Sequence, residues 1–481
     1  MPAWISRWNQ KLFSALKIMD REKIFRDPLY GYVSIPETYC KEFIDTPIFQ
    51  RLRRIEQTSM RVLYPSAHHD RFAHSIGVYH LGRLAFSHLE KNSRGFFENK
   101  ISDAEWGRYK RTFEIACLMH DCGHSPFSHT FEHYYLLGKE KEIRDRISEF
   151  YGDDARFAEE YDGENPADHE KISALLLLEQ FYRKTENMDA SPELAARMIM
   201  GVMYEDGDIK KKFENKLISL LNGKGIDVDS LDYIQRDSWV SGVSNVDIDY
   251  QRLLSALMIK PDEHENIRIV FKKNALSVID NISIGRNFLF KWIYSHHKVE
   301  YEQYLLKTIV EEINQENNFC KEIFSIETFT ETKDFNGHKY YLPADDDIIH
   351  TIKQFAEGNA KIREFLSRDY KYKALWKTYF EFNEVHFRDV SGDNRMRIAK
   401  ELEKKLSKEY GEGKILCLEV NPKLKSIKKN EFFVDIDGEL IDASRATYQI
   451  NENLTYFIVY VTEDLRSKKK KIIEDILALQ R

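Results

Sequence analysis

Three histidines and an aspartate crowd into one short stretch, CLMHDCGHSPFSHTF, which runs from Cys117 to Phe131. The pair His120 and Asp121 follows an apolar run at helical spacing, so we expect both side chains to emerge at the buried end of a helix, where polar groups need partners. Neighbours on a helix point about 100° apart, which suits adjacent ligands of an octahedral ion better than a tetrahedral zinc site. An adjacent pair is common by chance, but in this setting it predicts a site for Mn, Mg, Fe or a similar divalent ion.

Two ligands cannot complete such a site, so other segments must supply more. His74 begins an apolar helical run upstream, and the segment from Ile226 to Asp237, IDVDSLDYIQRD, gathers four aspartates around a tyrosine. Ordinary structural roles are open to two of these aspartates. Asp227 is suited to cap a helix that begins near Ser230, and Asp232 is suited to face solvent.

Five segments of the chain belong together: DPLYG (27–31), DTPIFQRLR (45–53), RFAHSIGV (71–78), HDCGHSPFSH (120–129) and DVDSLDYIQRD (227–237). As a set they resemble the HD-domain phosphohydrolases, and within them the deoxynucleoside triphosphate triphosphohydrolases. The resemblance covers about residues 20 to 310, and it implies a mainly α fold with a helical HD-domain phosphohydrolase core and a small C-terminal α+β lobe.

The resemblance also implies roles around the metal. The ion would hold the α-phosphate and lower the pKa of a bound water, and the leaving nucleoside 5′-oxygen would need a proton. A carboxylate three residues after a histidine can orient its ring, and a protonated imidazole can neutralise phosphate charge. The implied metal ligands are His74, His120, Asp121 and Asp229, and the implied catalytic residues are His129, Glu132, His124 and His169.

Other residues match positions that hold the substrate in this family. A planar guanidinium can grip two phosphate oxygens, and a tyrosine ring packed on the sugar leaves no space for a ribose 2′-hydroxyl. Tyr294 is equally well interpreted as a core aromatic of a helix. The implied roles are phosphate binding for Arg71 and Arg286, binding of the sugar 3′-hydroxyl for Gln57 and Asp237, and sugar packing for Tyr233 and Tyr294.

Asp45, Gln50 and Arg53 correspond to residues that bind an activating nucleotide in some family members. Because such sites lie between subunits in the family, the resemblance implies a homotetramer or homohexamer. Two departures change the expected contacts: Arg26 stands where the vertebrate members have an asparagine in that regulatory site, and Ser230 stands where they have a lysine that contacts phosphate. Arg53 is equally suited to an ordinary ion pair on a helix surface.

The composition limits the classes of partner. The chain has 481 residues, of which 42% are hydrophobic and 31% charged, and a formal net charge of -7, so a nucleic acid is not indicated as the main partner. Five scattered cysteines without a CxxC pair indicate neither a zinc ribbon nor a disulfide framework and fit a reducing cytoplasm. We find no signal-peptide h-region, and the densest aliphatic run, Ala174 to Leu178, is too short to span a bilayer.

The elements that must position these residues are mostly helices. Apolar residues recur at helical spacing from about Ile44 to Tyr304, whereas Asp334 to Gly337 is a hairpin turn signal. We expect a helical catalytic body over residues 1–390 and an α+β lobe over residues 391–481. The lobe is predicted to contain strands at Ile415–Val420, Glu431–Ile436 and Leu454–Val461 and an amphipathic closing helix within Glu463–Leu479.

The favoured function is metal-dependent hydrolysis of a dNTP to a deoxynucleoside and inorganic tripolyphosphate. An alternative keeps the HD metal chemistry but acts as a phosphodiesterase or nucleotidase on another nucleotide or on single-stranded nucleic acid. Another alternative is a dNTP sensor without turnover. His129 and Glu132 argue against the sensor, because a pure binder has no need of a proton donor beside its metal.

Overall fold

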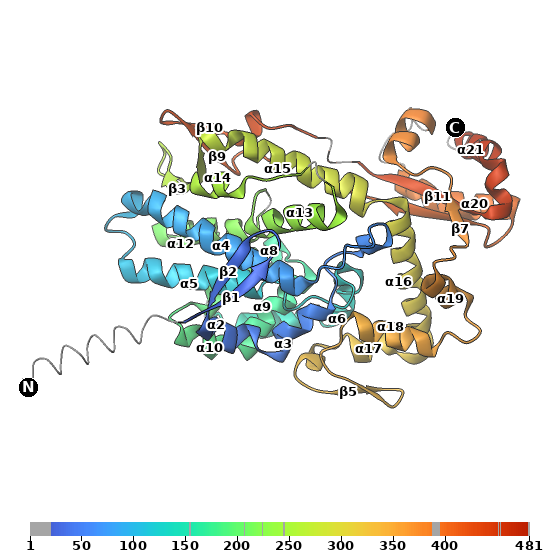
Figure 1. Cartoon of the computed structure of the whole chain (residues 1–481), viewed down its shortest axis with the longest axis horizontal. Helices are drawn as coiled ribbons and strands as arrows, with labels where there is room; N and C mark the ends of the chain where they lie inside the picture. Colours follow the sequence, from blue (N-terminus) through green and yellow to red (C-terminus); the bar gives the residue numbers. More distant parts are fainter. Residues whose placement is uncertain are drawn as a thin grey trace, which may run out of the picture.

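The chain folds into a mainly helical body with small sheets, as the computed structural model in Figure 1 shows. The structure describes residues 21–481 apart from residues 153–154, 206, 224, 244–245, 387–394, 451, 453 and 480–481. The predicted fold class is confirmed. The boundary predicted at residue 390 lies outside the described residues and stays a prediction.

Two long helices form the centre of the body. Helix α4 (Arg71–Ser93) begins at the N-cap Asp70, whose side chain accepts a hydrogen bond from the Ala73 amide, and α5 (Asp103–Met119) begins with a capping box between Ser102 and Glu105. The two helices pack along much of their length, and α13 (Val228–Ser241) packs on α4. Gly77 allows that approach, because a Cβ atom there would lie 1.9 Å from the Asp232 Oδ1 atom. These three helices carry all four predicted metal ligands or end beside them.

Shorter helices surround this centre, and the long helix α16 (His297–Asn317) lies between the body and the sheet near the C-terminus (Figure 1). Helix α9 (Asp168–Gln180) packs against α11 and α7 and supplies His169. The remaining helices are α2 (Glu37–Tyr39), α3 (Pro47–Gln50), α6 (His133–Leu136), α7 (Glu140–Glu149), α8 (Ala155–Glu164), α10 (Tyr182–Asn187), α11 (Pro192–Met200), α12 (Ile209–Leu221), α14 (Tyr250–Ser255), α15 (Leu276–Phe288), α17 (Phe319–Ile323), α18 (Asp345–Gln354), α19 (Ala360–Ser367), α20 (Arg395–Tyr410) and α21 (Lys469–Leu479).

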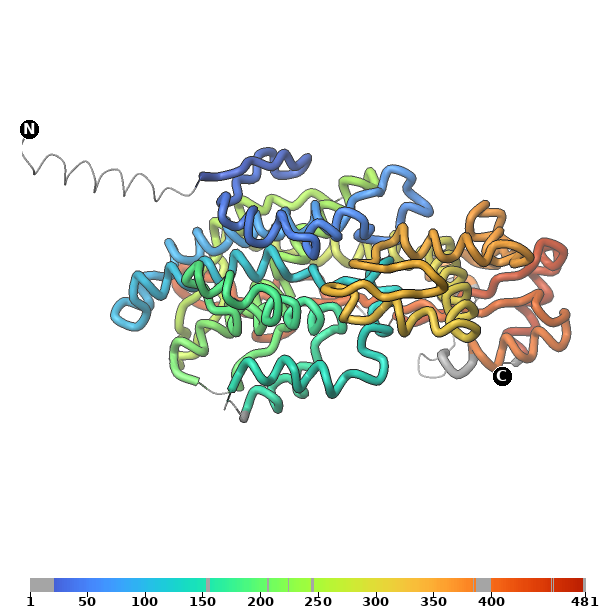
Figure 2. The backbone as a smooth tube through the Cα atoms, turned by 90° about the horizontal axis from the view of Figure 1, so that it is seen from below, coloured from blue at the N-terminus to red at the C-terminus, as the bar shows by residue number. Residues whose placement is uncertain are grey.

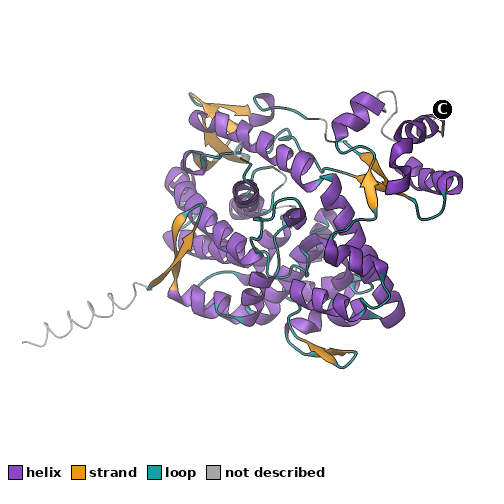
Figure 3. Cartoon of the chain, turned by 45° about the vertical axis from the view of Figure 1, so that its right-hand side comes forward, coloured by secondary structure: helices purple, strands orange, loops and turns teal. Residues whose placement is uncertain are grey.

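The strands lie around the margin of the helical body, as Figure 3 shows. Hairpins β1–β2 (Glu22–Asp27, Gly31–Pro36) and β5–β6 (Lys333–Phe335, His338–Tyr340) are antiparallel, and the second confirms the turn signal at Asp334 to Gly337. The two larger sheets have the orders β10-β9-β4-β3 and β7-β11-β8. Their strands are β3 (Leu257–Pro261), β4 (Ile267–Lys272), β7 (Tyr372–Ala374), β8 (Ile415–Val420), β9 (Phe433–Ile436), β10 (Glu439–Asp442) and β11 (Tyr456–Thr462).

The C-terminal elements largely follow the sequence prediction. Strands β8, β9 and β11 fall within a few residues of the three predicted strands, and the closing segment is a 3₁₀ helix followed by α21. Sheet β7-β11-β8 and the last helices lie at one end of the molecule, in orange to red in Figure 2. Strand β9, however, pairs in parallel with β4, so the predicted helical body (1–390) and the predicted α+β lobe (391–481) each supply strands to one sheet. The sequence reading did not predict β3 and β4 within the helical region.

Candidate functional site

The four predicted metal ligands converge at one point. His74 lies in the first turns of α4, His120 is the C-cap of α5 with Asp121 next to it, and Asp229 lies in the first turn of α13. The His74 Nε2 atom lies 2.9 Å from Asp229 Oδ1 and 3.7 Å from Asp121 Oδ2. The His120 Nε2 atom lies 3.3 Å from His74 Nε2 and 3.4 Å from Asp121 Oδ1. The structure therefore brings together two imidazoles and two carboxylates from three helices.

The partners on the far side of each ring indicate that this group fits a cation. The Nδ1 atom of His74 lies 2.7 Å from Asp232 Oδ2, and that of His120 lies 2.9 Å from the Cys117 carbonyl oxygen. Because both partners are acceptors, each Nδ1 carries a proton, so the Nε2 atoms are the ring nitrogens that would bind an ion. Two imidazoles and two carboxylates that meet in this way can bind a cation through their Nε2 and carboxylate oxygen atoms. Histidine and carboxylate ligands fit a divalent ion, and neither donor type selects among Mn, Mg and Fe.

The electrostatics around His74 agree with this conclusion. Burial disfavours charge on the ring, but hydrogen bonds to Asp229 and Asp232 outweigh burial and raise the pKa of His74 to about 10. The surroundings therefore draw a proton to this position, and the same negative potential would favour a metal ion.

Asp232 orients His74, and the interpretation of this residue as solvent-facing is wrong. Its side chain is fully buried, and it accepts hydrogen bonds from the Tyr30 hydroxyl at 2.8 Å and from the Arg236 guanidinium at 2.8 and 2.9 Å. Sequence reasoning missed this role, although a spacing of three residues places Asp229 and Asp232 on the same face of α13. A carboxylate behind a metal-binding histidine fixes the tautomer of the ring.

Asp227 and Ser230 serve the start of α13. The Asp227 carboxylate accepts a hydrogen bond from the Ser230 amide at 2.7 Å, and the Ser230 hydroxyl donates to the Asp227 carbonyl at 2.9 Å. The capping role considered for Asp227 is therefore confirmed. The hydroxyl that replaces the family lysine is occupied by the cap, so it does not substitute for a phosphate contact.

A second cluster gathers three histidines on Glu132. The Nδ1 atom of His169 lies 2.8 Å from the carboxylate, that of His129 lies 3.2 Å from both oxygens, and that of His124 lies 3.8 Å away. The His124 and His169 rings stack with centroids 3.9 Å apart, and His124 Nε2 lies 3.2 Å from Asp121 Oδ1. The cluster is therefore in direct contact with the predicted metal group.

The backbone of this cluster differs from the helix that the spacing of His129 and Glu132 suggested. Helix α5 ends at Met119, His129 lies in a 3₁₀ turn (Ser128–Thr130), and Glu132 precedes α6. Gly123 allows the loop to approach α9, because a Cβ atom there would lie 2.4 Å from the Ser173 amide nitrogen. His129 and Glu132 meet through this turn and not through a continuous helix.

The charge states within the second cluster are distinct. Burial disfavours charge on Glu132, but hydrogen bonds from His129 and His169 outweigh it and lower the pKa of the carboxyl. Burial also disfavours charge on His169, but the hydrogen bond to Glu132 outweighs burial and raises the pKa of this ring. Burial and the nearby positive charge of Arg71 both lower the pKa of His124. The His129 side chain is 63% exposed. This combination suits proton transfer: an anionic carboxylate holds one accessible imidazole and one imidazole that favours its charged form.

Arg71 and Asp345 hold the loop between the two clusters. The Arg71 guanidinium donates to Asp121 Oδ2 at 2.6 Å and to the Ser128 hydroxyl at 2.8 Å, so it pairs with a predicted metal ligand. Asp345, at the start of α18, accepts the Phe127 amide at 2.6 Å and the Glu56 amide at 3.0 Å. Phe127 and Ser128 have left-handed backbone conformations with φ of 56° and 55°, which non-glycine residues rarely adopt. Sequence reasoning missed Asp345.

The predicted substrate residues form three contacting pairs, which are Tyr294 with Asp237, Tyr233 with Arg286, and Arg71 with Gln57. The Tyr294 hydroxyl donates to Asp237, which also contacts His69 Nε2 at 2.6 Å, while the ring packs against the hydrophobic core, so both interpretations of Tyr294 stay open. The positive charge of Arg286 partly offsets the rise that burial causes in the pKa of Tyr233, so these two residues are neighbours. Arg286 also donates to the Lys423 carbonyl at 3.3 Å.

Gln57 accepts a hydrogen bond from the Arg71 guanidinium at 3.5 Å through its backbone carbonyl. It is buried, and its Oε1 atom has no hydrogen-bond partner among the described residues. A buried carbonyl of this kind is normally satisfied by a ligand or by water.

The residues predicted to bind an activating nucleotide are only partly connected. Asp45 pairs with Lys23 at 2.9 Å, whereas Arg53 donates to the Gln50 side chain at 3.0 Å and lies over the Phe72 ring. Arg26 lies over the Tyr32 ring. No regulatory role follows from these contacts, and the role stays a prediction.

Comparison with known proteins identifies the domain. Residues 71–211 match the model of the HD domain. Uncharacterized protein YwfO of Bacillus subtilis is 28% identical over 304 residues, which cover 62% of this chain and 57% of that protein. Deoxynucleoside triphosphate triphosphohydrolase SAMHD1 of Bos taurus is 30% identical over 295 residues, covering 61% and 48%. SAMHD1 of Danio rerio is 26% identical over 397 residues, covering 79% and 59%. The chain thus spans about half of the length of these relatives.

Solved structures show the same fold at low identity. A hypothetical protein from Aquifex aeolicus aligns with a TM-score of 0.61 and 23% identity, over 94% of this chain and 100% of the other. A phosphohydrolase from Bacteroides thetaiotaomicron aligns with a TM-score of 0.61 and 20% identity, over 92% and 100%. The domain match shows that residues 71–211 form an HD domain, and the histidine–aspartate group lies in and next to it. Among the described residues, no helix is both long and apolar enough to cross a membrane.

Proposed function

We propose that this HD-domain chain hydrolyses dNTPs to a deoxynucleoside and inorganic tripolyphosphate. One observation supports the proposal above the others: the group of His74, His120, Asp121 and Asp229 contacts a histidine cluster whose exposed member is held by an anionic carboxylate. The first group suits a phosphate-binding metal and the second suits protonation of a leaving oxygen. The names of the Bos taurus and Danio rerio relatives favour dNTPs as substrates.

Each residue then has a defined task in the reaction. The metal, when bound, supplies positive charge for the α-phosphate and acidifies water. Water attacks the α-phosphorus, the bond from phosphorus to the 5′-oxygen breaks, and His129 gives a proton to that oxygen. Glu132 accepts a hydrogen bond from His129 Nδ1 and stabilises the charged ring, while His169 adds positive charge beside the phosphates. The products are a deoxynucleoside and tripolyphosphate, because cleavage occurs on the nucleoside side of the α-phosphorus.

Selection of the sugar is assigned to the group beside the metal site. Asp237, which contacts Tyr294 and His69, would accept a hydrogen bond from the 3′-hydroxyl. The side-chain Oε1 atom of Gln57, which has no partner among the described residues, would be a second acceptor. Tyr233 would fill the space that a 2′-hydroxyl needs, which excludes ribonucleotides more strongly than a lost hydrogen bond would.

The direct test is product analysis. Protein loaded with Mn or Mg is incubated with each dNTP singly and with all four together, and both deoxynucleoside and tripolyphosphate are quantified. Asp121→Ala and His129→Ala serve as matched variants. Tripolyphosphate from the wild type that disappears in both variants supports the assignment. Release of pyrophosphate or orthophosphate in its place, or binding without turnover, would show that the assignment is wrong and favour a different HD phosphohydrolase or a sensor.

We also propose that the protein acts as a homotetramer or homohexamer that a nucleotide activates. The proposal rests on the correspondence of Asp45, Gln50 and Arg53 with regulatory residues of the family. Mass measured by light scattering with and without nucleotide tests the assembly. Activity that appears only in the dNTP mixture and is lost in Arg53→Ala tests the activation.

A further inference from the structure

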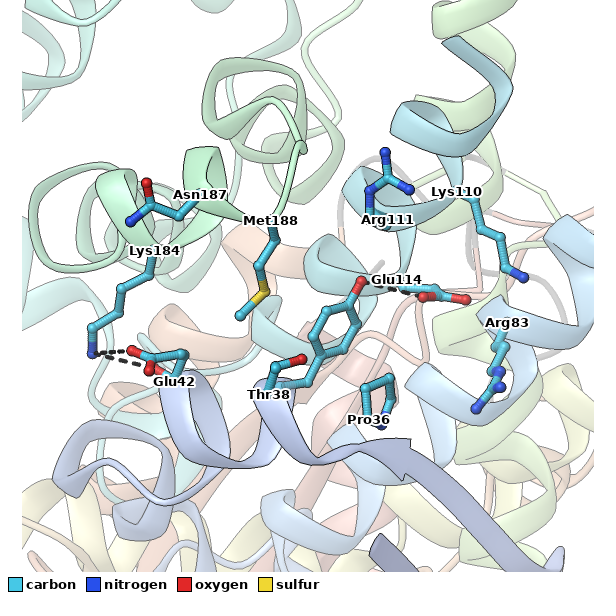
Figure 4. Close-up of a pocket in the computed structure, with 11 residues that line it drawn as sticks. Pro36, Thr38, Glu42, Arg83, Lys110, Arg111, Glu114, Lys184, Asn187 and Met188 are labelled. Carbon is cyan, nitrogen blue, oxygen red and sulfur yellow. Dashed lines mark hydrogen bonds and ion pairs between the residues drawn. The ribbon is translucent and has the colours of Figure 1, made fainter. Parts of the chain in front are cut away.

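A second pocket lies away from the metal site, between the chain after β2 and helices α4, α5 and α10 (Figure 4). Its volume is about 660 Å³, within the usual range for small-molecule sites. Four cations line it, and Figure 4 shows Arg83, Lys110 and Arg111 around Glu114 on one side and Lys184 with Glu42 on the other. No residue predicted to bind metal, substrate or activator lines this pocket.

The cations differ in how far the protein already neutralises them. Arg83 donates to Glu22 and the Ser34 carbonyl, Arg111 pairs with Asp189, and Lys184 contacts Glu42. Lys110 forms no hydrogen bond or ion pair with any residue that the structure describes, although it lines the pocket and is only half-buried. Burial raises the pKa of Glu114 and the charge of Lys110 opposes that rise, so these two side chains are neighbours. An anionic ligand on this side of the pocket would meet Lys110 and two arginines, each of which already pairs with one carboxylate.

Glu114 in the same pocket needs a hydrogen-bond donor. It is 5% exposed, its Oε2 atom accepts the Tyr39 hydroxyl at 3.3 Å, and its Oε1 atom has no hydrogen-bond partner among the described residues. Leaving a carboxylate oxygen buried without a donor is unfavourable, so a ligand with an N–H group would satisfy it. Pro36 and Met188 add apolar wall.

We propose that this pocket binds a nucleoside phosphate, with its phosphate paired by Lys110 and neighbouring cations and a base N–H donated to Glu114. Inorganic phosphate would satisfy the cations alone and leave Glu114 and most of the volume unfilled. The site is also placed to affect catalysis, because α5 carries Glu114 and ends beside His120, roughly 9 Å further along the helix axis.

The test uses the full metal-loaded chain and titration calorimetry, with ATP, GTP, CTP and UTP as nucleoside phosphates and inorganic tripolyphosphate as the base-free probe. The variants are Lys110→Ala, Glu114→Gln and, as a matched control on the same helix but outside the pocket, Arg108→Ala. We expect at least one nucleotide to bind, Lys110→Ala to weaken it by roughly tenfold or more, and Arg108→Ala to leave it unchanged. Glu114→Gln should weaken the nucleotide and leave tripolyphosphate binding as it was.

Three outcomes would overturn the proposal. They are no binding by any nucleotide, equal losses in Lys110→Ala and Arg108→Ala, and an unchanged nucleotide affinity in Glu114→Gln together with a loss of tripolyphosphate binding in Lys110→Ala. The last outcome would reduce the pocket to a simple anion site. Turnover of dNTPs by the same preparations reports separately on the proposed function, because none of these variants alters a residue of the metal or histidine clusters.

Discussion

Asp345 offers the sharpest test of how the site is held, because a single buried carboxyl ties two distant segments together. Its oxygens accept the amides of Glu56 and Phe127, and the Ser128 hydroxyl that follows donates to the Glu56 carbonyl at 2.6 Å. Leaving a buried amide without its acceptor costs about 1 to 3 kcal/mol, and Asp345 is the acceptor for two such amides. We expect Asp345→Ala to lower the free energy of unfolding by about 2 to 5 kcal/mol.

The pH dependence gives the same residue a second, independent signature. Burial raises the pKa of Asp345 to about 7 from its ordinary value of 3.8, although the Glu56 and Phe127 amides oppose the rise. Between these values the folded state holds a proton that the unfolded state has lost, so the contribution of Asp345 to stability falls as pH rises. The shift of about 3 units corresponds to roughly 4 kcal/mol over that window.

The assay is chemical denaturation of wild type and Asp345→Asn at several pH values from 4 to 8. The amide variant cannot lose a proton, so the stability advantage of the wild type should shrink as pH rises, by up to about 4 kcal/mol. In parallel, kcat/KM of Asp345→Ala should fall by roughly a hundredfold, because the loop that presents His129 loses its anchor. Parallel stability curves for wild type and Asp345→Asn would refute the buried proton. Unchanged kcat/KM in Asp345→Ala would refute the anchoring role.

Three further predictions concern the metal group. Asp232→Asn should weaken metal binding by roughly 10- to 100-fold, measured by competition with a chelating dye, because His74 loses the partner that fixes its tautomer; unchanged affinity would contradict that role. Gly77→Ala should destabilise the fold by more than about 1 kcal/mol in thermal unfolding, since its Cβ atom would overlap Asp232, whereas Gly95→Ala, with open space around the Cβ position, should have little effect. Removing divalent metal with a chelator should lower Tm, and saturating metal at about a hundred times its Kd should restore roughly 2.7 kcal/mol; no shift with any ion would argue against a metal site in the folded chain.

Local sequence was sufficient for the features whose physics is local. The helical spacing before His120, the hairpin signal at Asp334 to Gly337 and the β-branched runs near the C-terminus all predicted elements that the structure contains. The order and type of residues in the resembling segments identified four metal-ligand candidates, and these four side chains do meet in the structure. Their local backbone was less predictable: His129 and Glu132 lie three residues apart but meet through a 3₁₀ turn.

The features that the sequence did not reveal depend on partners far away in the chain. Strands β3 and β4 lie in a region of helical pattern, and β4 gains a parallel neighbour only from β9, more than 160 residues later. Asp232 could have been found from its spacing to Asp229, since both must face α4 if one of them binds the metal beside His74. Nothing comparable was available for the contact between Glu132 and His169, which depends on the close approach of the loop to α9 at Gly123.

Asp345 shows why a residue whose partners are distant in the chain is not predicted from the sequence, although it holds part of the site in place. It lies in a run of three aspartates at the start of a helix, where acidic residues are ordinary because they favour the helix dipole. Asp347, in the same run, does what that pattern predicts and accepts the Ala344 amide at 2.8 Å. The two carboxyls differ in role only because of the fold, in which Asp345 accepts hydrogen bonds from amides 218 and 289 positions away. The left-handed Phe127 and Ser128 are less favourable by about 1 to 2 kcal/mol each, and the two hydrogen bonds of Asp345 are large enough to offset that strain. The conformation that presents His129 therefore depends on α18, which lies outside the segment that matches the HD domain.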